Sequence, residues 1–116
     1  MPRNIVDAVQ GTLETLILRT LSWGEMHGYG IARWILDSSG DELRIEEGTL
    51  YPALHRMEER GLLEAAWGIS DRKRRAKFYR LTRAGEAELR ARLADWRRYT
   101  SAVTRVLEAA PGGGRG

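Results

Sequence analysis

The chain of 116 residues has room for one compact domain and one extended element. Its 42% apolar and 30% charged residues are typical of a soluble globular protein and argue against intrinsic disorder. The absence of cysteine excludes a disulfide framework and a cysteine-based zinc site, and no apolar run approaches the roughly 18–20 residues that span a bilayer. Residues 1–10 lack the apolar core of a signal peptide, so we expect a cytoplasmic protein.

The net charge of +3 is unevenly distributed along the chain. Residues 70–83 hold seven Lys or Arg side chains against the single acid Asp71, so this window carries +6 and the other residues carry −3. A basic block on an otherwise slightly acidic protein indicates a localised contact with a polyanion.

Residues 1–10 are weakly patterned, and we interpret them as an N-terminal extension. The first helix is predicted from Thr12 to Leu21, because apolar residues recur there at helical spacing. Glu14 and Arg19 fall between the apolar positions, so we expect both side chains to face solvent.

A second helix is predicted from Ile31 to about Ser38, introduced by the segment His27–Gly30. The pair Gly28 and Gly30 is reminiscent of a dinucleotide-binding fingerprint, but no strand precedes it and Arg33 occupies the position of the third glycine. We therefore interpret the two glycines as allowing a tight turn and close helix packing.

The third helix carries an apolar stripe at positions i, i+4 and i+7, formed by Leu50, Leu54 and Met57. Thr49 is predicted to be its N-cap, Pro52 fits the first turn because it has no N–H, and Gly61 provides the C-terminal stop. Side chains with hydrogen-bonding groups fall outside the stripe and are expected in solvent; they are Thr49, Tyr51, His55 and Arg56.

Beyond Gly61 the pattern changes to the period of a strand. Residues 62–67 and 76–81 are predicted to form a hairpin, joined by the polar and basic residues 68–75. Because this loop is long for a hairpin, we expect it to project.

The last helix is predicted to follow the N-cap Thr82 and to run to about Leu107. About 25 residues at ~1.5 Å each span close to 40 Å, which is longer than a small domain needs. We therefore expect its apolar seam to pair with a second molecule. The seam comprises Leu89, Leu93, Trp96, Val103 and Leu107 (or Val106), with Thr100 as a polar interruption. Residues 111–116 are expected to be a flexible tail.

Three helices followed by a two-stranded wing and a long helix predict a mainly α fold with a small β-hairpin, a winged helix-turn-helix. We place this DNA-binding domain at residues 11–82 and the dimerisation helix at residues 83–110. The third helix would offer side chains to base edges, and the basic loop would neutralise phosphates. The candidate DNA contacts are Thr49, Tyr51, Pro52, His55, Arg56, Arg72, Lys73, Arg74, Arg75 and Lys77.

Four segments resemble the PadR family of bacterial transcriptional regulators, and they are residues 26–30, 47–54, 59–61 and 74–82. The most specific of them is Glu-Gly-Thr-Leu-Tyr-Pro-Ala-Leu at residues 47–54. The resemblance extends from Gly11 to about Leu107 and is to the short branch of the family. It implies a homodimer formed through the last helix, a palindromic operator and repression, with DNA contacts from Tyr51, Lys73, Arg74 and Arg75.

Alternative interpretations stay open for several of these residues. Tyr51 could instead pack within its helix. In one branch of the family, tryptophans at the dimer centre stack on flat aromatic ligands, so Trp96 and Tyr99 are candidates for an effector site, with interface packing as the alternative.

Other classes of function find less support in the sequence. His27 and His55 form no metal-ligand cluster, and no nucleophile–base–acid set is visible, so we expect no cofactor and no enzyme. A winged-helix adaptor that docks an acidic protein is the alternative to DNA binding. RNA binding is disfavoured because Phe78 is the lone aromatic candidate for stacking on the sheet.

Overall fold

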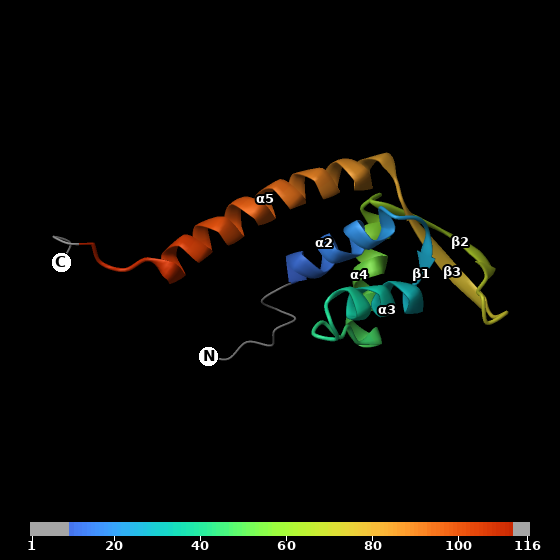
Figure 1. Cartoon of the computed structure of the whole chain (residues 1–116). Helices are drawn as coiled ribbons and strands as arrows, with labels where there is room; N and C mark the ends of the chain where they lie inside the picture. Colours follow the sequence, from blue (N-terminus) through green and yellow to red (C-terminus); the bar gives the residue numbers. More distant parts are fainter. Residues whose placement is uncertain (1–9, 113–116) are drawn as a thin grey trace.

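The computed structural model describes residues 10–112 (Figure 1). The predicted extension before residue 10 and the tail after residue 112 lie outside the described residues. Within them are four helices and three strands, which confirms the mainly α winged-helix fold. In chain order they are α2 (Gln10–Leu21), β1 (Met26–His27), α3 (Gly28–Ser38), α4 (Glu47–Glu59), β2 (Leu63–Ile69), β3 (Arg75–Leu81) and α5 (Arg83–Glu108).

The sheet has the order β1-β3-β2, and both strand pairs are antiparallel. β2 and β3 form the predicted hairpin, from the pair Leu63–Leu81 at its base to Ile69–Arg75 near its turn. β1 was not predicted, because two residues are too few to show a strand period. It ties the start of α3 to the hairpin, with His27 opposite Phe78.

The core lies where α2, α3 and α4 converge and where the base of the hairpin covers them. The predicted apolar stripes of all three helices are buried, and Tyr79 closes the core from β3. Fully buried side chains include Ile17, Leu18, Ile31, Leu50, Leu54, Met57 and Leu63. None of the described helices is both long and apolar enough to cross a membrane.

Helix α4 begins earlier than the sequence predicts. Its N-cap is Glu46, whose carbonyl accepts from the amides of Thr49 and Leu50 at 3.0 and 2.9 Å, and no side chain caps the helix. Thr49 therefore stands inside the first turn and is not the N-cap. Pro52 falls in the second turn, where it leaves the carbonyl of Gly48 without its helical donor. The predicted stop is confirmed, since Gly61 has a φ of 77°.

Helix α3 also begins earlier, at Gly28 instead of Ile31. The reason is that His27 caps it: the amide of Gly30 donates to Nδ1 of His27 at 2.9 Å. Close packing at the glycines is confirmed, because a Cβ at Gly28 would lie 2.4 Å from the hydroxyl oxygen of Tyr51. The predicted tight turn is not observed, since both glycines belong to the first turn of helix α3.

Helix α5 starts as predicted, with the amide of Gly85 donating to the hydroxyl of Thr82 at 3.0 Å. Its first turns return over α2, and Figure 1 shows the remainder leaving the domain on the side away from the hairpin tip. Leu89 is buried in its own domain and Leu93 packs against the same core. The start of the predicted dimer seam is therefore already covered, and the exposed seam begins at Trp96.

Candidate nucleic-acid interface

Tyr51 lies on the exposed side of α4 with its side chain 43% accessible. Its ring rests against the first turn of α3, at Gly28. Partial burial, followed by the nearby Glu47 carboxylate, raises the pKa of the Tyr51 hydroxyl above its ordinary value of 10.0. The hydroxyl therefore stays protonated at neutral pH and can donate a hydrogen bond.

Three other predicted contacts share this part of α4. Pro52 and His55 are exposed, and Thr49 is half-buried. Nε2 of His55 lies 3.3 Å from a carboxylate oxygen of Glu59, which turns the imidazole along the helix surface. These residues present a mostly uncharged leading face.

Arg56 does not have the free side chain that the sequence predicts. Its Nε lies 3.8 Å from a carboxylate oxygen of Glu14, and the residue is half-buried. Lys77 is likewise paired, since its ammonium lies 3.2 Å from Glu58. The predicted contact of Arg56 with base edges and that of Lys77 with DNA would therefore require each side chain to leave an ion pair within the chain.

The turn of the hairpin is shorter than predicted, because the strands continue to Ile69 and Arg75. The amide of Lys73 donates to the carbonyl of Ser70 at 2.8 Å, and Lys73 adopts a φ of 61° that closes the turn. Four cations remain exposed around it, as the sequence predicts: Arg72, Lys73, Arg74 and Arg75.

Two of these cations lie over aromatic rings, those of Tyr29 and Trp67. The guanidinium of Arg72 is 5.5 Å from the ring centroid of Tyr29, and that of Arg75 is 4.7 Å from the ring of Trp67. Trp67 is 61% exposed, so its contact with Arg75 takes place at the surface. Such contacts hold a guanidinium in place without neutralising it, so the cation stays available to an anion.

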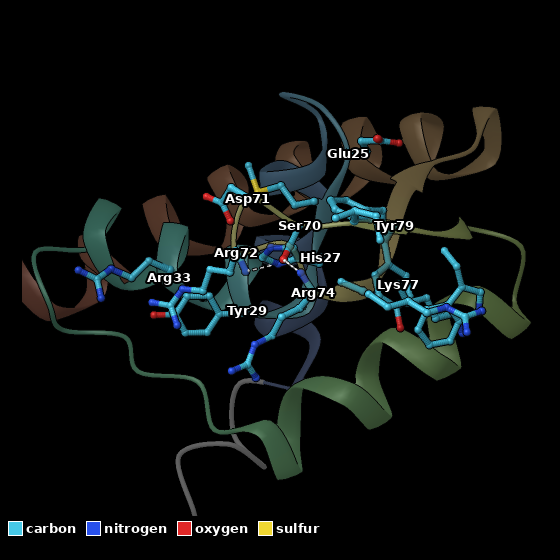
Figure 2. Close-up of a pocket in the computed structure, with 18 of the residues that line it drawn as sticks. Glu25, His27, Tyr29, Arg33, Ser70, Asp71, Arg72, Arg74, Lys77 and Tyr79 are labelled. Carbon is cyan, nitrogen blue, oxygen red and sulfur yellow. Dashed lines mark hydrogen bonds between the residues drawn. The ribbon is translucent and has the colours of Figure 1, made fainter.

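An open groove of about 1130 Å³ separates the hairpin from the start of α3 (Figure 2). Tyr29 and Arg33 of α3 line one wall, and Arg72 and Arg74 come from the turn. Tyr51 of α4 borders the same groove. Of the predicted contacts, the groove brings together Tyr51, Arg72, Arg74, Arg75 and Lys77, whereas Thr49, Pro52, His55, Arg56 and Lys73 do not line it. The sequence analysis gave neither Tyr29 nor Arg33 a role in DNA binding, although Tyr29 lies in the family-like segment 26–30; their place in this wall depends on the pairing of β1 with β3.

The distal half of α5 is an exposed apolar surface within one copy of the chain. The rings of Trp96 and Tyr99 are 6.2 Å apart and are 45% and 64% exposed. The hydroxyl of Thr100 donates back to the carbonyl of Trp96 at 2.9 Å, which satisfies the polar interruption of the seam. Val103 and Leu107 continue this surface, together with Val106.

A metal site finds no support in residues 10–112, where no three His, Cys, Asp or Glu side chains gather closely enough to hold an ion. His27 instead caps α3, with its ring 5.2 Å from that of Phe78.

Comparison with known proteins gives a consistent answer. Residues 17–91 match the sequence model of the transcriptional regulator PadR-like family. A transcriptional regulator from Clostridium thermocellum superposes with a TM-score of 0.77 at 28% identity, over 85% of this chain and 96% of that one. A PadR family transcriptional regulator from Eggerthella lenta gives 0.76 at 32% identity, over 91% and 90%. The transcriptional regulator Rv3488 of Mycobacterium tuberculosis is 38% identical over 73 residues, which are 63% of this chain and 64% of that protein.

Proposed function

Because the chain belongs to the PadR-like family of transcriptional regulators, which are not enzymes, we propose that it binds a palindromic operator as a homodimer and represses transcription. One observation carries the proposal: Tyr51 of α4 and exposed arginines of the hairpin border the same groove. A duplex laid against them meets the exposed face of α4 and the cations of the hairpin at the same time. In a bacterium the operator lies in the cytoplasm, where we place this activity.

Helix α4 is the part of the domain that enters the major groove in this proposal. Its exposed leading face offers Thr49, Pro52 and His55 to base edges. The protonated hydroxyl of Tyr51 donates to a phosphate oxygen at the edge of the groove.

The hairpin holds the sugar–phosphate backbone through Arg72, Lys73, Arg74 and Arg75. Each cation that meets a phosphate releases condensed counterions, so affinity falls steeply as salt rises. Arg56 and Lys77 are left out of this set, since Arg56 is held in an ion pair with Glu14 and Lys77 in one with Glu58.

The homodimer forms through the exposed half of α5. Trp96, Thr100, Val103 and Leu107 face the second copy, with Val106 beside them, whereas Leu89 and Leu93 stay in their own domain. A two-fold axis between the copies then requires a palindromic operator. An effector site at Trp96 and Tyr99 would need walls from the second copy, because in one copy both rings lie on open surface.

Selection of bound sequences from random DNA by the purified protein tests this function. We expect an enriched sequence with two-fold symmetry and half-site centres about 10 base pairs or a multiple apart. A reporter gene behind that sequence should be silenced when the protein is present, and raised expression would make it an activator. No enrichment at low salt, together with retention of an acidic protein partner, would favour the adaptor function instead.

A further inference from the structure

Glu14 is buried, although its position in the pattern of α2 predicts exposure. Its side chain is 8% exposed and faces three guanidinium groups. Arg60 at the C-cap of α4 lies at 3.2 Å, Arg92 of α5 at 3.0 Å, and Arg56 of α4 at 3.8 Å. One carboxylate thereby joins α2, α4 and α5.

Arg92 is the member of this network that reaches the dimerisation helix. Its side chain is 18% exposed, and its guanidinium also bonds Glu88 at 2.6 Å. A planar guanidinium with several fixed donors constrains orientation more strongly than an apolar contact, over which helices can slide. Replacing such a buried polar cluster by apolar side chains is often no less stable, so stability alone gives little reason for it.

The network is the second of two polar attachments of α5 to the domain, beside the apolar packing of Leu89 and Leu93. At the first, the hydroxyl of Thr82 donates to the carbonyl of Gly61 at 2.6 Å, and a Cβ at Gly85 would lie 2.2 Å from the carbonyl oxygen of Leu62. Arg92 follows Gly85 by about 10 Å along the axis at ~1.5 Å per residue. These two polar attachments hold the helix at two separate places along its axis and so constrain its direction.

The exposed half of α5 acts as a lever beyond the second point. From Arg92 to Glu108 it extends about 24 Å at ~1.5 Å per residue. A tilt of ~10° at Arg92 therefore moves the end by about 4 Å, close to the ~3.4 Å spacing of base pairs.

We propose that Glu14 is a positioning residue, which fixes the angle between α4 and α5 and so sets the spacing of the two recognition helices in the homodimer. The inference rests on the proposed function for its effect on DNA. The angle itself is a property of the free protein.

Distances between spin labels measure this angle without DNA. Because the chain has no cysteine, a pair of labels can be introduced cleanly by Gly48→Cys and Ala102→Cys. Both positions are exposed, and a Cβ at Gly48 meets nothing within 4 Å. Mixing labelled protein with an excess of unlabelled protein makes nearly every labelled dimer carry only one labelled copy.

In this background, Glu14→Gln is expected to shift or broaden the distance distribution. Arg92→Lys keeps the charge but loses the planar group that bridges Glu14 and Glu88, so we expect a smaller shift of the distance distribution. This milder variant serves in case Glu14→Gln fails to fold. The matched control is Glu64→Gln, which removes an exposed carboxylate paired with Arg80. Distributions unchanged in both network variants would overturn the proposal.

The second measurement compares operators whose half-sites are moved apart by one to three base pairs. The ratio of affinities for the best and the shifted spacings is expected to fall about tenfold in Glu14→Gln, within the coupling range of residues that share a network. If Glu14 had a purely structural role, Glu14→Gln would weaken operator binding equally at all spacings. That result would refute the positioning role. If no variant and no wild-type protein binds DNA, the proposed function fails, and the label distances still decide the angle.

Discussion

The arginines of the hairpin and the arginines around Glu14 are the same residue type in opposite environments. Around the turn, Arg72 and Arg75 lie over aromatic rings and keep their charge available. Around Glu14, Arg60 and Arg92 meet a buried carboxylate. In the proposed function, the cations that the fold leaves without an acid contact DNA, and those that meet a buried carboxylate hold helices together.

The largest expected effect comes from the available cations. Replacing Arg72, Lys73, Arg74 and Arg75 together by alanine should weaken operator binding at least about a hundredfold at 0.15 M salt, and the slope of log affinity against log salt should fall by up to ~3.6, at ~0.9 per phosphate contact. Titrations over a range of salt measure both. Thermal unfolding should be nearly unchanged, and an unchanged salt slope would remove the hairpin from the interface.

The next effect comes from a compensated cation. Burial alone would lower the pKa of Arg92, but the hydrogen bonds that its guanidinium donates to Glu88 and Glu14 outweigh it and raise the pKa. Arg92→Ala leaves Glu14 with fewer partners, so we expect a loss of about 2 kcal/mol in the free energy of unfolding, less than a fully buried pair would lose.

Denaturant titration of Arg92→Ala against Arg90→Ala, an exposed position two residues earlier on α5, isolates the network. Equal stability of the two variants would contradict the assignment of Arg92 to architecture.

A smaller effect is expected at Tyr51, which is a neutral hydrogen-bond donor and belongs to neither group of cations. Tyr51→Phe should reduce operator affinity about fivefold, the equivalent of one hydrogen bond of ~1 kcal/mol. The folded state raises the pKa of the Tyr51 hydroxyl above 10.0. The hydroxyl therefore donates its hydrogen bond to DNA below pH 10, and this contribution to affinity is lost as pH rises through the pKa of the folded state.

Binding measured at pH 7 to 9 should therefore show a constant ratio between wild type and Tyr51→Phe. A ratio near one would assign Tyr51 to packing against Gly28 alone.

The smallest effect is expected at Lys77, whose charge Glu58 compensates. Lys77→Gln should change operator affinity less than about twofold and leave the salt slope unaltered, in contrast to alanine at Arg74 alone. A slope as reduced as that of Arg74→Ala would show that Lys77 leaves Glu58 to meet DNA, and the distinction between the two groups of cations would then fail.

Local patterns were sufficient to predict most of the fold. The stripes of Leu50, Leu54 and Met57 on α4 and the N-cap of α5 at Thr82 are set by neighbours in sequence. Strand β1 escaped prediction, because its pairing partner Tyr79 is distant in the chain. The early start of α4 was not predicted, because no side chain caps the helix there and only the backbone carbonyl of Glu46 accepts its first hydrogen bonds.

The candidate interface was predicted less completely, for a related reason. The exposed cations of the hairpin could be read from composition. The ion pair of Arg56 could not, because its partner Glu14 lies in another helix and has the sequence position of an ordinary solvent-facing acid of α2. The burial of Leu89 followed from how far α5 returns over α2, which periodicity does not encode.

The turn at Lys73 has a consequence for stability. A φ of 61° disfavours any residue with a Cβ, by roughly 1 kcal/mol relative to glycine. Glycine at this position would relieve the strain and would also delete a charge from the tip of the hairpin. At this residue, glycine would therefore favour stability and lysine favours attraction for DNA. The chain has lysine there, with the strained backbone.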